Sequence, residues 1–155
     1  MAVSTYTSTA YNKDVIKAPH IGNCTIGPYK VQWTAAGTVG DILFLAKVPH
    51  GARVVAFEEY HSNGETAATM DFGFNKGIAA GGGANASCLI SGGLVAVMNR
   101  NTFAASPAGW LGKISLSDTD PIRYATLIGK AAAGTFTTSV SLQYTLTYRM
   151  DETDT

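Results

Sequence analysis

The residues whose side chains could do chemistry are few and spread along the chain. The candidates are the histidines His20, His50 and His61, the cysteines Cys24 and Cys88, and the carboxylate pairs Glu58/Glu59 and Asp118/Asp120. An enzyme needs a nucleophile beside a base, a metal cluster, or paired carboxylates in a pocket. Most of these residues stand alone in the sequence, so it offers few ways to build such a site.

Metal binding has two sequence candidates. His20 and Cys24 stand four residues apart, but structural zinc sites usually show two close ligand pairs, and Gly22 splits this one in a segment without a helix signal. We interpret the pair as turn residues beside a buried thiol. Asp118 and Asp120 precede Pro121 in a turn that local hydrogen bonds explain, with a calcium site as the alternative. We predict no metal site.

Catalytic motifs are missing. The nucleophile-elbow pattern G-x-S-x-G does not occur. The segment Gly109–Ser115 has the wrong spacing for a phosphate-binding P-loop, and Gly81–Gly83 lacks the spacing of a dinucleotide fingerprint. Glu58 and Glu59 are adjacent, so in a strand they point to opposite faces. We predict a protein that is not an enzyme and has no cofactor, with a small hydrolase assembled from scattered residues as a remote rival.

Composition limits the partners. The chain has 11 Lys and Arg against 11 Asp and Glu, and only 14% of its residues are charged. The basic residues are scattered, whereas nucleic-acid binding needs a basic footprint, so we predict no nucleic-acid partner. No apolar run approaches the ~20 residues that span a bilayer, and residues Met1–Tyr6 lack the basic and apolar regions of a signal peptide. We therefore expect no membrane partner and assembly in a cytoplasm. Cys24 and Cys88 are expected as two buried free thiols, with one disulfide as the alternative.

Period-two alternation identifies the fold class. It is unbroken over Ser139–Met150, which predicts a strand with one buried face. Shorter alternating segments surround Val31, Phe72, Ile114 and Ile122. The 17 glycines leave little room for helices, since each costs about 1 kcal/mol in a helix interior.

These segments predict an all-β protein, an antiparallel β-sandwich. The sandwich covers residues 13–150, after an extended N-terminal arm at residues 1–12 and before an acidic tail at 151–155.

Local signals predict how the strands connect. Pro49–Gly51 favours a hairpin between Ile42–Ala46 and Arg53–Phe57. A break in alternation at Glu58–Glu59 predicts a β-bulge there. Phe136 is expected to open the last hairpin, after the small-residue turn Ala131–Gly134.

Four residues are candidates for contacts with another protein subunit. Tyr6 and Tyr11 lie on the polar arm, where there is no core to join, and tyrosine suits protein contacts. Leu43 and Leu45 belong to a segment apolar on both sides, which indicates a strand in the middle of a sandwich or under a neighbouring subunit. We expect deletion of Met1–Asn12 to leave the fold intact and to weaken the attachment of the chain to its partner protein.

A family resemblance rests on the block Asp41–Val55 with its Lys-Val-Pro-His-Gly-Ala-Arg-Val turn, on Met70–Phe74, and on the ending Gly134–Tyr148. These segments resemble small structural proteins of tailed bacteriophages, the capsid decoration or cement proteins. The resemblance implies a jelly-roll-like sandwich, often a homotrimer, that binds the outer face of the major capsid protein lattice and stabilises the head. It places the chain on the capsid surface of the virion. The arm and the two cysteines are not part of the pattern.

The alternative function is a carbohydrate-binding β-sandwich or a tail-associated adhesin. Sugar binding normally needs an exposed aromatic platform, which Trp33 or Trp110 would have to supply.

Overall fold

A computed structural model describes residues 5–7, 11, 22–32, 37–63, 65, 67–79, 83–96, 100–104, 113–137 and 140–150. His20, Trp33, Trp110 and the acidic tail lie outside the described residues, and so do most of the arm and Gly81–Gly82. The strands are β1 (Thr5–Thr7), β2 (Gly22–Gln32), β3 (Ile42–Pro49), β4 (Arg53–Asn63), β5 (Thr69–Ala79), β6 (Gly83–Leu94), β7 (Arg100–Ala104), β8 (Tyr124–Ala133) and β9 (Ser141–Met150). The described part contains no helix long and apolar enough to cross a membrane.

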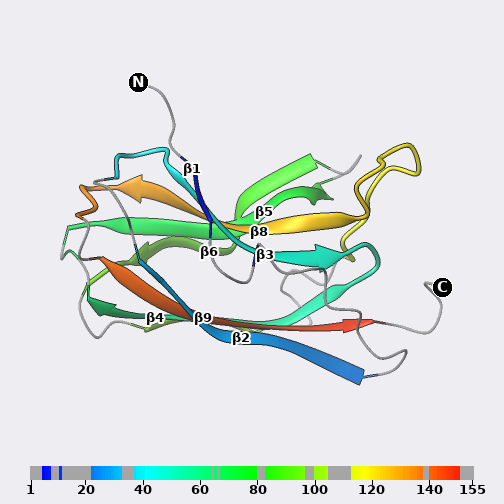
Figure 1. Cartoon of the computed structure of the whole chain (residues 1–155), viewed down its shortest axis with the longest axis horizontal. Helices are drawn as coiled ribbons and strands as arrows, with labels where there is room; N and C mark the ends of the chain where they lie inside the picture. Colours follow the sequence, from blue (N-terminus) through cyan, green and yellow to red (C-terminus); the bar gives the residue numbers. More distant parts are fainter. Residues whose placement is uncertain are drawn as a thin grey trace.

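The strands form two stacked sheets. One sheet has five strands in the order β1-β3-β8-β5-β6, and the other has four in the order β2-β9-β4-β7 (Figure 1). Every neighbouring pair is antiparallel except β1 and β3, which run parallel. Leaving β1 aside, two four-stranded sheets in this order make a jelly roll. The predicted all-β antiparallel sandwich is therefore confirmed.

The two predicted hairpins are wrong. Strands β3 and β4 belong to different sheets, and so do β8 and β9. The turn after Pro49 carries the chain from one layer to the other, with Gly51 at a φ of +86°, and Phe136 lies between β8 and β9 on a crossing segment. A short turn rich in Pro and Gly reverses the chain in either arrangement, so local sequence does not distinguish a hairpin from a crossing between layers.

Strand β9 confirms the alternation in detail. Leu142, Tyr144, Leu146 and Tyr148 are at most 1% exposed, while Gln143 and Arg149 face solvent. β9 pairs with β2 on one side and with β4 on the other, so it forms the centre of the four-stranded sheet. Its apolar face points at the five-stranded sheet.

The bulge in β4 is not where alternation indicated. The register against β9 shifts between Val54 and Ala56, while Glu58 and Glu59 pair regularly with Thr145 and Tyr144. The shift restores the period, so the inward row runs from Val54 to Phe57, Glu59 and His61. The alternation of residue types breaks at Glu58–Glu59 only because Glu59, a charged residue type, occupies an inward position.

The core fills the space between the sheets. Its largest fully buried side chains are Tyr144, Tyr148, Phe57, Phe72, Phe74, Phe136, Leu43, Leu45, Met70, Ile114, Leu127 and Leu142. Both sheets contribute to this set. Neighbouring backbones also approach closely: a Cβ added at Gly73 would lie 2.2 Å from the carbonyl oxygen of Asn85, so only glycine fits there.

Candidate functional site

Histidine, cysteine and carboxylate side chains do not gather into a metal cluster in the described part of the chain. Cys24 packs in the core at 9% exposure, and Cys88 is partly buried on β6. Neither forms a disulfide, as predicted. The pairing of His20 with Cys24 is not tested, because His20 lies outside the described residues.

The two thiols sit in environments that disfavour chemistry. Burial raises the pKa of the Cys88 thiol to about 11, so it stays protonated at neutral pH. Because the thiolate is the nucleophile, Cys88 is a poor one. Cys24 lies opposite Tyr148 across β2 and β9. Burial, together with a side-chain hydrogen bond that the hydroxyl donates to Cys24, raises the pKa of Tyr148.

A buried polar cluster lies on β4. The side chains of Glu59 and His61 are both 0% exposed, and Oε2 of Glu59 lies 2.7 Å from Nε2 of His61. The two atoms are within ion-pair distance, but the geometry of the contact is not that of a hydrogen bond. Neither atom has a hydrogen-bond partner among the described residues. The amide nitrogen of Asn101 on β7 donates to the other Glu59 oxygen and to the carbonyl of Leu94, 3.0 Å away.

The sequence analysis did not predict this cluster of ionisable side chains. The signal was present, because Phe57, Glu59 and His61 continue one period-two row once the bulge is placed at Val54–Ala56. Complete burial keeps any substrate away from the pair in this structure. We therefore interpret it as a structural contact between β4 and β7, which Asn101 extends to the neighbouring sheet.

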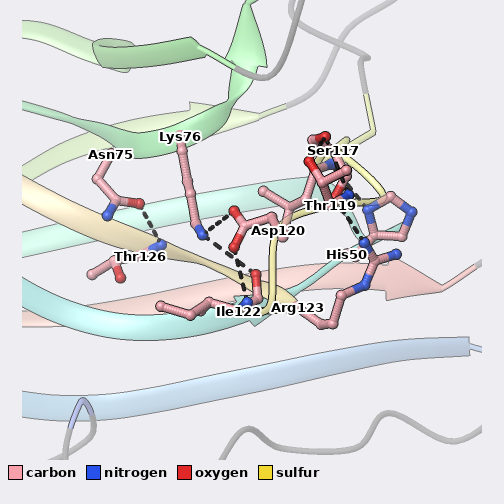
Figure 2. Close-up of polar contacts among 10 residues, drawn as sticks. His50, Asn75, Lys76, Ser117, Thr119, Asp120, Ile122, Arg123 and Thr126 are labelled. Carbon is pink, nitrogen blue, oxygen red and sulfur yellow. Dashed lines mark hydrogen bonds and ion pairs between the residues drawn. The ribbon is translucent and has the colours of Figure 1, made fainter.

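A second polar cluster fixes the segment 113–123 to the end of the five-stranded sheet. Figure 2 shows Lys76 of β5 reaching Asp120, with its ammonium 2.5 Å from Oδ2 of the carboxylate. The other Asp120 oxygen accepts from the backbone of Ile122 at 2.8 Å. The Lys76 bond lowers the pKa of Asp120. The Lys76 ammonium thus binds Asp120, one of the two carboxylates that a calcium site at Asp118 and Asp120 would need.

His50 joins the same segment to the β3–β4 turn. Its Nδ1 accepts a 3.0 Å hydrogen bond from the backbone of Leu116, and Gly51 bonds to the carbonyl of Ile114 at 2.8 Å. Figure 2 places His50 beside this segment, away from Lys76. The structure shows a side chain that holds two loops together.

The predicted contact residues lie in two different settings. Leu43 and Leu45 are 1% and 0% exposed, covered by the opposite sheet of their own chain. The hydroxyl of Tyr144 donates a 2.5 Å hydrogen bond to the carbonyl of Leu45. The prediction that these leucines touch another subunit is not tested by a single chain, but the surface that such a contact would use is already buried.

Tyr6 and Tyr11 lie against the chain's own five-stranded sheet. Tyr6 belongs to β1 and pairs with Leu43 of β3. The ring of Tyr11 lies 5.1 Å from that of Phe44, and the Lys47 ammonium sits 5.0 Å from the Tyr11 ring. Part of the predicted arm thus contacts its own domain. A contact with another subunit stays a prediction.

The outer face of the four-stranded sheet has a different composition. Directly opposed residues on neighbouring strands share a face, which defines rows across β2, β9, β4 and β7. One row is Lys30, Gln143, Tyr60 and Arg100; the next is Thr145, Glu58 and Thr102; a third is Thr25 and Thr147; the last contains Arg149 and Arg53. Lys113 bridges to Arg53 beside the last row. We call this surface the basic face.

The basic face carries almost only positive charge. Glu58 is the one outward carboxylate on the described parts of these four strands, and it lies 3.7 Å from the Arg100 guanidinium. Hydroxyl and amide side chains lie between the cations, and a shallow pocket is lined by Ala56, Phe57, Glu58, Thr145 and Thr147. Strand pairing thus brings four basic residues that are far apart in the sequence, Lys30, Arg53, Arg100 and Arg149, onto one face, which residue spacing did not reveal.

Comparisons with known proteins give the fold. The sequence matches no protein-family model and no curated protein. Two solved structures share the architecture at 18% sequence identity. A chain in a structure described as the capsid of Ralstonia phage GP4 aligns over 95% of this chain and 98% of its own length, with a TM-score of 0.67. A chain in the cyanophage Pam1 capsid asymmetric unit aligns over 92% and 99%, with a TM-score of 0.59.

Both alignments span nearly the whole of each chain. The protein therefore shares the complete jelly roll with these chains, and neither alignment is limited to a fragment of a larger fold. At this identity the likeness establishes the fold.

Proposed function

We propose that this chain is a structural protein of a bacteriophage virion, a decoration or cement protein that binds the outer face of the major capsid protein lattice and stabilises the head. The observation that carries the proposal is the end-to-end likeness to chains in two phage capsid structures. The sequence resemblance of Asp41–Val55 and Met70–Phe74 to decoration proteins is an independent reason for the finer assignment.

The architecture suits such a role. The core is closed between two sheets, and the two polar clusters Glu59–His61 and Lys76–Asp120 are structural contacts. A protein that binds only the assembled shell stabilises that state by mass action. In this proposal the chain acts as a homotrimer on the capsid surface, which lets several weak contacts bind together.

The test is the protein's stoichiometry in particles. Virions purified from the phage that encodes this chain should contain it at a copy number matching the capsid lattice, measured by quantitative mass spectrometry against the major capsid protein. Heads lacking the chain should rupture at lower temperature than complete heads. Absence from virions, or a copy number far below the lattice, would refute the proposal.

A further inference from the structure

We propose that the basic face, the outer surface of the four-stranded sheet, docks on a protein surface rich in exposed carboxylates. This inference rests on the proposed function, since it assigns the surface through which the chain would attach to an acidic patch of the capsid. The partner is identified by its chemistry alone: clustered Asp and Glu side chains on a folded surface.

Charge distribution is the first reason. The whole chain is formally neutral, with 11 basic and 11 acidic residues. Four of its nine described basic residues, Lys30, Arg53, Arg100 and Arg149, lie on this face with the single carboxylate Glu58. The other sheet and its adjoining loop carry Lys47, Lys76, Arg123 and Lys130 together with Asp71, Asp118 and Asp120. Other acidic groups are elsewhere: Glu59 and Asp41 are buried, and Asp120 is bonded to Lys76 on the five-stranded sheet. Complementary charge steers association and fixes orientation.

The surface between the cations is the second reason. Thr25, Thr145, Thr147, Gln143 and Thr102 point outward along the rows, and Thr25 and Thr147 are within hydrogen-bonding distance of one another at 3.3 Å. Short hydroxyl and amide side chains on a regular sheet form a flat surface with donors and acceptors at fixed spacing. Such a surface can match another folded protein with little loss of side-chain entropy.

The same features disfavour nucleic acid. Proteins that bind single strands stack bases on several aromatic side chains, and Tyr60 is the one aromatic residue among the described outward positions of the basic face. Duplex binding depends on many phosphate contacts, and Glu58 interrupts the positive charge at the centre of the face.

The test removes charge from the row farthest from the C-terminal end of β9. Gln143, which lies between Lys30 and Tyr60, precedes Arg149 along β9 by roughly 20 Å at about 3.4 Å per residue. The row of Lys30 and Arg100 is therefore well separated from the acidic sequence that follows Met150. The test variant is Lys30→Gln with Arg100→Gln. The control, Arg123→Gln with Lys130→Gln, removes the same charge from exposed positions on the other sheet and its adjoining loop.

Binding is measured on capsids of the same phage assembled without this chain, with short duplex DNA as a second probe. The variant Lys30→Gln/Arg100→Gln should bind capsids about tenfold more weakly at moderate salt, whereas the control should bind like wild type. Added poly-L-glutamate should displace wild type from the capsids. Thermal unfolding of both variants should match wild type, because both sites are exposed.

Each contrary result has a distinct meaning. If wild type and the basic-face variant bind capsids equally, or both variants lose affinity equally, the docking face is wrong while the proposed function stands. If wild type does not bind capsids at all, the proposed function fails, and this inference with it. If wild type binds duplex DNA more tightly than capsids and the basic-face variant loses that binding, the partner is nucleic acid and the proposal is overturned.

Discussion

The outward-facing side chains of the two sheets differ in solvent exposure. On the five-stranded sheet, Thr126 and Ile128 of β8 point away from the core and yet are only 3% and 5% exposed. Phe44, which pairs with Ile128, packs on Tyr11. On the four-stranded sheet the corresponding outward positions of β9, such as Gln143 and Arg149, are exposed. The outer face of the five-stranded sheet is covered around the centre of β8, whereas that of the four-stranded sheet is open, polar and basic along β9.

Their inward faces differ as well. The inward positions of β3, β5 and β8 are apolar, while β4 of the four-stranded sheet places Glu59 and His61 in the interior. The two-residue period of a strand determines which side chains share a face, but it does not determine whether that face is exposed to solvent or buried. The neighbours of each sheet decide that.

The largest expected effect concerns the inward pair of Glu59 and His61. His61→Leu leaves the buried Glu59 carboxyl group without its 2.7 Å partner, and removing one member of a buried ionisable pair costs about 3 kcal/mol or more. The free energy of unfolding, measured by denaturant titration, should fall accordingly. The double variant Glu59→Leu/His61→Leu removes both polar groups and should recover much of that loss. A single variant within about 0.5 kcal/mol of wild type would show that the pair makes no net contribution.

A smaller effect should separate the two outward faces. Ile128→Ala on the covered face removes buried methyl groups and should lower the free energy of unfolding by about 2 kcal/mol. The matched truncation Thr145→Ala on the basic face should change it by less than about 0.5 kcal/mol. Equal costs in the same denaturant titration would contradict the contrast between a covered and an open face.

The smallest effect depends on pH and lies at the Lys76–Asp120 contact. Because the folded state lowers the pKa of Asp120, the contact stabilises the fold above the ordinary Asp pKa, and this stabilisation is lost as pH falls through the lowered value. Asp120→Asn keeps the oxygen that accepts from Ile122 but removes the charge. Its melting temperature should lie slightly below that of wild type at pH 7, and the difference should shrink in acid. A difference that is independent of pH would show that charge plays no part.

Much of the fold could be predicted from local pattern. Alternation over Ser139–Met150 identified β9 and its buried face, since the two-residue period follows from the geometry of an extended chain. The glycine content correctly argued against helices in the described part. The four candidate contact residues stay a prediction: Tyr6 belongs to β1 of the five-stranded sheet, Tyr11 packs on Phe44, and Leu43 and Leu45 lie in the core.

Sequence alone thus determined the sandwich class and, for β9, the inward and outward rows, because these depend on spacing along one strand. Tertiary structure alone decided that β3 and β4 lie in different layers and that Glu59 meets His61 out of water. It also decided that Lys30, Arg100 and Arg149 share one face. These features depend on which strands become neighbours, and pairing between distant segments is set by the free energy of the whole sandwich rather than by any short stretch of residues.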